Sequence, residues 1–93
     1  MFQELNPLLH SRLRLAIVSY LVSKGKSDFV EIQEITQATS GNISVQLKKL
    51  ENAEYISISK SFLDNYPHTV IKITPKGIDA FEEYVKAIKD YIG

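Results

Sequence analysis

The sequence contains no cysteine among its 93 residues. This absence excludes a disulfide framework and any metal site built from thiolates. No apolar run approaches the roughly 20 residues that a membrane-spanning helix needs, and the first ten residues, MFQELNPLLH, lack the basic-then-apolar layout of a signal peptide. We therefore expect a cytoplasmic protein that has no membrane segment.

An excess of charge of one sign is also lacking, since 11 basic and 11 acidic residues give a formal net charge of zero. Residues 1–29 carry four basic and two acidic side chains, residues 30–55 two and four, residues 56–75 two and one, and residues 76–93 three and four. There is no basic tail or block, which disfavours a protein that coats nucleic acid through bulk charge. Any nucleic-acid surface must be local.

Patterns typical of catalysis, metal binding and cofactor binding are missing too. His10 and His68 are far apart and have no acidic neighbours at ligand spacing, so no metal site is predicted. The serines lack the flanking glycines of a nucleophile elbow, and Gly41 and Gly77 do not form a phosphate-binding loop. The sequence thus predicts a protein that is not an enzyme and has no cofactor.

Helical periodicity dominates the first part of the chain. Asn6 is suited to cap an initial helical piece, with Pro7 at its first position. The segment RLRLAIVSYLVSKG then predicts a central helix that is apolar nearly all round and that ends at Gly25. One apolar stripe of this helix consists of Leu13, Ala16, Ile17, Tyr20 and Leu21.

Two shorter helices are expected next, joined by the tight turn ATSG. Asp28 precedes Glu31 by three residues, which is a capping-box spacing, and this second helix should stop near Ala38. Thr39 or Ser40 would cap the third helix. Its narrow inward stripe is formed by Ile43, Leu47 and Leu50.

A hairpin and a last helix follow. The segments around Ile56–Ser61 and 70–74 alternate as strands do, and residues 63–68 read as the loop between them. Thr74 would cap a helix over residues 75–92, with Pro75 at its first position. Its apolar residues are spaced by three and four, as in a coiled-coil seam; they are Ile78, Phe81, Val85, Ile88 and Ile92.

This order predicts a mainly α, α+β fold: a winged helix-turn-helix with a three-helix core, a two-stranded β wing and a C-terminal dimerisation helix. A single domain over residues 1–93 is expected. Residues 1–10 and the helix over 75–92 are predicted to form a homodimer interface, because so short a chain has too little core to bury all of their apolar side chains.

Three segments of the chain resemble a known family. LNPLLHSRLRLAIVSYL, DFVEIQEITQATSGNISVQLKKLENAEYI and ITPKGIDAFEEY are similar to the small winged-helix transcriptional regulators of the MarR/ArsR superfamily. The likeness is greatest to a short single-domain group with the pattern L-x-P-L-x-H-S-x-x-R-L-x-I. It extends over nearly the whole chain, and its most specific parts are SGNISVQLKKLE and ITPKG.

The resemblance implies a dimer whose third helices enter the major groove of double-stranded DNA while the wings reach the flanking backbone or the minor groove. The implied recognition surface is Ser40, Gly41, Asn42, Ser44, Val45, Lys48 and Lys49, and the implied wing contacts are Lys60, Tyr66 and His68. Asn42 and Gln46 are types of residue that read base edges. Arg12, Arg14 and Lys72 are further candidates for contacting phosphates, together with the lysines above.

Two other interpretations remain open. A winged helix that docks a protein partner instead of DNA is favoured by the neutral charge, by Val45 on the outer face, and by Asp64 in a wing without Arg or Lys between Leu63 and Thr69. A repressor that responds to a small-molecule effector is compatible with DNA binding. Its pocket at the dimer interface would be lined by Tyr20, Tyr84 and Tyr91.

Overall fold

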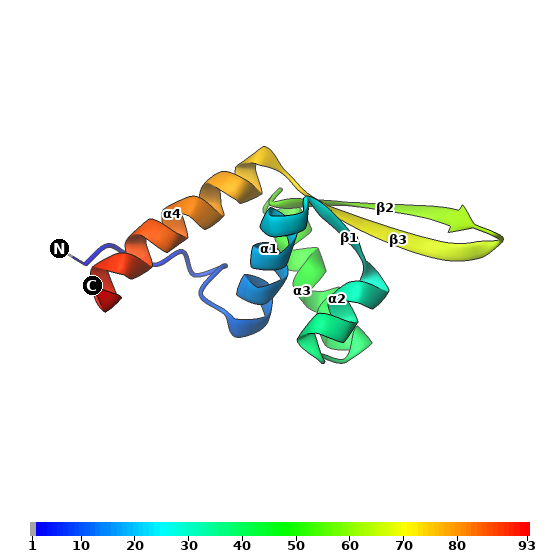
Figure 1. The fold of residues 1–93 in the computed structure, drawn as a ribbon, viewed down its shortest axis with the longest axis horizontal. Helices are drawn as coiled ribbons and strands as arrows, with labels where there is room; N and C mark the ends of the chain where they lie inside the picture. Colours follow the sequence, from blue (N-terminus) through cyan, green and yellow to red (C-terminus); the bar gives the residue numbers. More distant parts are fainter. Residues whose placement is uncertain (1) are drawn as a thin grey trace.

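The computed structural model describes residues 2–93; Met1, the first residue of the predicted dimerisation segment, lies outside the described residues. The elements follow the order α1 (Arg12–Lys24), β1 (Lys26–Asp28), α2 (Phe29–Thr36), α3 (Ser40–Asn52), β2 (Ile56–Leu63), β3 (Tyr66–Ile73) and α4 (Pro75–Ile92). Helices α1, α2 and α3 form the centre, and the β2–β3 hairpin and α4 extend from it in opposite directions (Figure 1). This arrangement gives the molecule a long axis of 53 Å.

The central helix α1 begins at Arg12, as predicted, but the initial helical piece predicted at Asn6 does not form a helix. Asn6 does cap a turn, since its Oδ1 accepts hydrogen bonds from the backbone N–H groups of Leu8 and Leu9, but the turn does not continue as a helix. Ser11 caps α1 and accepts from the N–H of Arg14. The helix ends at Gly25, as predicted, with φ of 86°, a conformation that glycine adopts without strain.

The helix-turn-helix unit is set by two side-chain caps. The Asp28 carboxylate accepts from the N–H of Glu31 at 2.8 Å, and the Thr39 hydroxyl accepts from the N–H of Asn42 at 3.2 Å. Helix α2 ends at Thr36, two residues before the predicted end at Ala38, because Gln37 turns into the left-handed region with φ of 58°. The turn then reverses the chain into α3.

The sheet has three strands rather than the two predicted, in the order β1-β3-β2, and both pairings are antiparallel. The additional strand is β1, which pairs Ser27 with Ile71. The predicted loop over residues 63–68 is wrong: β2 runs to Leu63 and β3 starts at Tyr66. The hairpin turn is Asp64 and Asn65 alone, both with positive φ (51° and 68°), which is the backbone of a tight two-residue hairpin turn.

The core lies between α1, α2, α3, the inner face of the sheet and one face of α4. Ile43, Leu47 and Leu50 are buried, as predicted for α3. Ala16 is exposed, so the predicted stripe of α1 is wrong at that position. The fully buried side chains are Leu9, Ile17, Val18, Leu21, Ile32, Ile43, Leu50 and Ile71.

Helix α4 buries a different stripe from the seam that its spacing predicted. Gly77, Tyr84 and Ala87 are the buried residues of α4, whereas Val85 is half-buried and Ile92 is 77% exposed. Residues 2–10 run beside α4 (Figure 1), and the Tyr91 hydroxyl near the end of α4 donates to the carbonyl of Gln3 at 2.6 Å. Within residues 2–93 no helix combines the length and the apolar character that crossing a membrane requires.

Candidate nucleic-acid interface

Helix α3 is held by its inner stripe and presents its opposite side to solvent. The buried side chains are spaced by four and three residues, so they share one face. Val45, in the middle of the outer surface, is 52% exposed. The predicted contact residues Ser40, Gly41, Asn42, Ser44, Val45, Lys48 and Lys49 are all exposed, and Gln46 is half-buried.

A groove separates α3 from the wing and brings together residues from both elements. Its volume is about 430 Å³, and its lining includes Ser44 and Lys48 from α3 and Lys60 and Thr69 from the hairpin. Two of the predicted phosphate contacts, Lys48 and Lys60, therefore line one concave surface. Glu51 lines the same groove and pairs with Lys48 at 3.4 Å, so this carboxylate lies at the candidate interface.

The wing residues divide between the two faces of the hairpin. Lys60 pairs with Thr69, Leu63 with Tyr66, and Ser61 with His68. Because side chains alternate along a strand, Tyr66 and His68 lie on the face opposite Lys60. His68 lines a separate hollow with residues of β1. The structure therefore brings Lys60 toward α3, but not Tyr66 or His68.

Arg12 lies near the other end of α3. It is exposed at the start of α1 and lines a hollow that Asn42 also lines. A cation at this place can reach the same ligand as the first turns of α3. The proximity supports the candidate role of Arg12, although the two residues are 30 positions apart in the sequence.

A chain of hydrogen bonds joins α1 to the exposed side of α3. Arg14 donates through Nη1 to Gln46 Oε1 at 2.5 Å, and Gln46 donates through Nε2 to Asn42 Oδ1 at 2.9 Å. Arg14 also donates through Nε to the carbonyl of Leu8 at 2.6 Å. The sequence predicts Arg14 only as a candidate phosphate contact, because nothing local to α1 indicates a partner 32 residues away.

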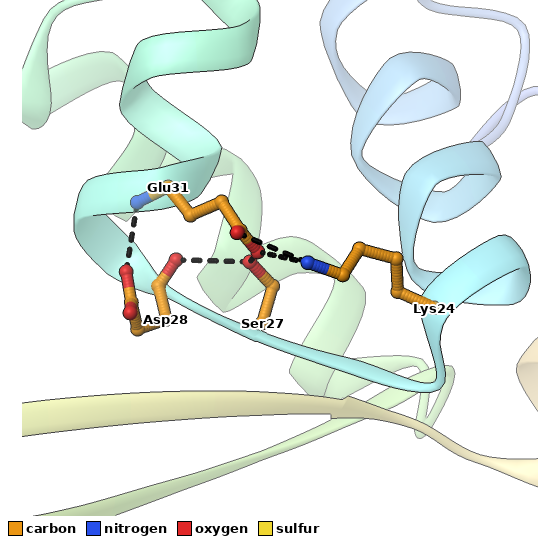
Figure 2. A network of polar contacts seen from close by, with 4 residues as sticks. All are labelled: Lys24, Ser27, Asp28 and Glu31. Atoms are coloured by element: carbon orange, nitrogen blue, oxygen red, sulfur yellow. Dashed lines mark hydrogen bonds and ion pairs between the residues drawn. The ribbon is translucent and has the colours of Figure 1, made fainter.

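A second polar cluster holds α2 against α1 and β1 (Figure 2). Lys24 at the end of α1 pairs with Glu31 at 3.0 Å, and the hydroxyl of Ser27 in β1 donates to the same carboxylate. The Ser27 hydrogen bond and the Lys24 ammonium lower the pKa of Glu31 below its ordinary value of 4.5. Hydrogen bonding to Glu31 raises the pKa of Lys24. The cluster thus fixes the start of the helix-turn-helix unit.

The lowered pKa of Glu31 makes part of the folding stability depend on pH. A carboxylate whose pKa falls on folding adds stability above its unfolded pKa, and this is lost as pH falls through the folded value. We expect Glu31→Gln to reduce the melting temperature at pH 7 and the deficit to shrink below about pH 4.5. Thermal melts by circular dichroism between pH 3 and 7 measure this. Glu34→Gln, on the exposed side of the same helix, is the matched control; an equal deficit for Glu31→Gln at all pH values contradicts the assignment.

Comparisons with known proteins agree with this geometry. Residues 13–92 match the family described as the winged helix DNA-binding domain. The uncharacterized protein MJ0432 of Methanocaldococcus jannaschii is 33% identical over 81 residues, which cover 87% of this chain and 88% of that protein.

Two solved structures show the same arrangement of elements. The transcriptional regulator homologue protein from Pyrococcus horikoshii OT3 superposes with a TM-score of 0.86 at 28% identity, over 91% of this chain and 84% of that chain. Bordetella bronchiseptica BpsR, whose DNA binding is regulated by 6-hydroxynicotinic acid, superposes with a TM-score of 0.77 over 92% of this chain and 64% of its own. At 15% identity, BpsR supports the fold alone.

The chain belongs to the winged helix DNA-binding domain family, since the match extends over most of its length. Within that class it is similar over nearly its whole length to a transcriptional regulator homologue. The predicted winged helix-turn-helix fold and the resemblance to winged-helix transcriptional regulators are thereby confirmed.

Proposed function

We propose that this protein is a dimeric, sequence-specific DNA-binding regulator of transcription that inserts α3 into the major groove. The observation that carries the proposal is the outer face of α3, which is free of the protein core and shares a groove with the wing. An α-helix fits the major groove, where Asn, Gln and Ser side chains can read base edges and an exposed valine can contact a thymine methyl group. Phosphates would be contacted by Lys48, Lys49 and Lys60. Arg12 would contact a further phosphate near the start of α3.

The proposed mechanism is steric. Two copies of α3 would occupy successive major grooves about 34 Å apart and read a near-palindrome, while the wings lie over the flanking backbone. A regulator of this kind performs no reaction, so we propose a non-enzymatic protein that acts in the cytoplasm.

The dimer would form through α4 and the N-terminal segment. Val85 lies seven residues from Ile78 and from Ile92, which places the three on one stripe of α4 beside its buried face. Ile78 and Val85 are half-buried, and Ile92 is exposed. Tyr91, near the end of this helix, stacks on Phe2 of the N-terminal segment with ring centroids 4.9 Å apart. The Phe2 side chain is 72% exposed. Apolar side chains gathered in this way are typical of a surface that a partner covers. We propose that a second copy of the chain is the partner.

A charged residue in this stripe should separate the subunits. We expect Val85→Glu to sediment as a monomer at low-micromolar concentration, where the wild-type protein sediments as a dimer, because burying an unpaired carboxylate in an apolar contact is unfavourable. Lys86→Glu, at the adjacent exposed position, adds the same residue outside the stripe and should stay dimeric. A monomeric wild-type protein under these conditions would exclude the α4 interface.

An effector ligand is a further part of the proposal. The molecule that regulates DNA binding by BpsR, 6-hydroxynicotinic acid, is a small aromatic acid. In this chain the three candidate tyrosines have separate partners within one subunit. Tyr84 hydrogen-bonds to His10, Tyr20 lies beneath the Lys24 ammonium, and Tyr91 stacks on the N-terminal segment. We propose that a shared pocket between Tyr84 and Tyr91 requires the second subunit.

Selection of bound sequences from random DNA, followed by a gel shift at low salt, tests the DNA-binding proposal. A regulator should enrich a near-palindrome and bind it more tightly as salt is lowered. The competing function is docking of a protein partner, which is favoured by the apolar end of the wing. Phe62, Leu63 and Tyr66 are 77%, 61% and 74% exposed there. A protein-docking module should ignore both random DNA and a heparin column.

A further inference from the structure

We propose that Arg14 is a specificity-positioning residue: it fixes the orientation of the Gln46 and Asn42 amides, so that α3 presents the amino group of Asn42 to the DNA. This inference rests on the proposed function and adds to it the class of base edge that α3 reads. It concerns a side chain that comes from another helix.

The geometry locks the Arg14 guanidinium from two sides. Its Nε donates to the carbonyl of Leu8 at 2.6 Å, which ties it to the turn before α1, and its Nη1 donates to Gln46 at 2.5 Å. Arg14 is half-buried, and its planar group carries donors in a fixed fork. A guanidinium held by two carbonyl-type oxygens in different elements has little freedom to turn away.

The direction of the hydrogen bonds follows from the chemistry of arginine. A guanidinium has five N–H donors and no acceptor, so the amide facing it must present its oxygen. Gln46 therefore turns Oε1 to Arg14 and its NH₂ group to Asn42, which must in turn present Oδ1, as the 2.9 Å contact shows. If either amide were flipped, its NH₂ group would face another N–H donor and the hydrogen bond would be lost. The orientation of both amides therefore follows from Arg14, and the NH₂ group of the exposed Asn42 makes no hydrogen bond in the part of the chain that the structure describes.

This polarity selects among the bases. An asparagine that reads adenine does so with both ends of its amide, accepting from N6 and donating to N7. In this protein one of the two lone pairs of the Asn42 oxygen already accepts from Gln46 and the amide is held in that orientation, whereas its amino group makes no hydrogen bond within residues 2–93. We infer that Asn42 reads an edge rich in acceptors, which in the major groove is the O6 and N7 edge of guanine. Arg14 would thus disfavour adenine at that position without touching DNA.

Replacing Arg14 with methionine tests the inference in two measurements. In the free protein, the side-chain NH₂ resonances of Asn42 and Gln46 should shift in a ¹H–¹⁵N spectrum, because their hydrogen bonds are released. In selection from random DNA, the roughly tenfold preference for guanine over adenine under Asn42 should be lost. Arg14→Lys keeps the charge but cannot donate to Leu8 and Gln46 in the same fork, so it should lose the preference too.

Arg12→Met is the matched control, because it removes the same charge from the same helix. Arg12 has no hydrogen bond to α3 within residues 2–93, so its loss should lower affinity and leave base preference unchanged. Circular dichroism confirms that each variant folds. An unchanged base preference in folded Arg14→Met, with wild-type protein that does select DNA, would overturn this inference alone. Wild-type protein that selects no sequence would overturn the proposed function itself.

Discussion

Replacing both Lys48 and Lys49 with alanine is expected to weaken DNA binding on the order of a thousandfold at 0.1 M salt. A dimer would lose four phosphate contacts, and each contact contributes a slope of about 0.9 to the dependence of log affinity on log salt. The slope should therefore fall by roughly 3.6, which is the sharper measurement because it counts the released ions. Titrations by fluorescence anisotropy at several salt concentrations supply both values.

The ion pair between Lys48 and Glu51 does not weaken this expectation. The two charges are 3.4 Å apart, and the lysine side chain is 70% exposed. A pair so accessible to water contributes little to stability, so Lys48 can leave Glu51 for a phosphate. Glu51 would remain in the groove, and we expect it to moderate the affinity of the wild-type protein.

A double variant of α4 serves as the control for charge. Lys86→Ala with Lys89→Ala removes two exposed positive charges from each subunit, in the C-terminal half of α4. It should leave the salt slope nearly unchanged, since neither side chain lies on the candidate interface. If both double variants lost the same amount of DNA-binding affinity, binding would depend on net charge alone. If the variant at Lys48 and Lys49 kept the wild-type salt dependence of binding, α3 would not be part of the DNA interface.

The helix boundaries could be predicted where a single side chain sets them. Asp28, Thr39 and Thr74 each accept a hydrogen bond from an N–H three residues later. These contacts are local, so the residue types and their spacing are enough to find them. The inner stripe of α3 was also predictable, because its burial follows from helical periodicity.

Strand β1 was missed for the opposite reason. Its three residues are too few to show alternation, and their hydrogen-bonding partners in β3 lie more than 40 positions further along the chain. The hairpin loop was overestimated because Tyr66, Pro67 and His68 follow two turn residues and resemble a loop. Pro67 is tolerated in β3 because this part of the strand lies beyond the pairing with β1, where the sheet has only two strands.

The candidate site was predictable by element but not by contact. The sequence placed Lys48 on the outer face of α3 and Lys60 on the wing, yet only the fold shows that they line one groove. Lys60 lies on the opposite face of the hairpin from Tyr66 and His68 because of the strand register. This register could not be predicted while residues 63–68 were taken to be a loop. The hydrogen bond between Arg14 and Gln46 likewise depends on how α1 packs against α3, which no local sequence pattern predicts.

Replacing Gly77 with alanine should destabilise the protein by about 2–4 kcal/mol, although alanine normally favours a helix by about 1 kcal/mol over glycine. A Cβ at this position would lie 2.2 Å from the carbonyl oxygen of Tyr55 and 2.8 Å from Ile73. The Tyr55 carbonyl cannot simply move, because it accepts a hydrogen bond from the N–H of Thr74, the residue that caps α4. Relieving the clash would shift α4 from the wing and disturb the geometry that the proposed dimer needs.

Urea unfolding followed by circular dichroism measures the effect, and a melting temperature lower by roughly 15 °C is expected for a domain of this size. Gly41→Ala is the matched control within α3. A Cβ there meets nothing within 4 Å, so the usual helix preference should apply and stability should rise by up to about 1 kcal/mol. The two substitutions are chemically identical and should change stability in opposite directions. Equal gains at both positions would show that α4 does not pack against the Tyr55 carbonyl in solution.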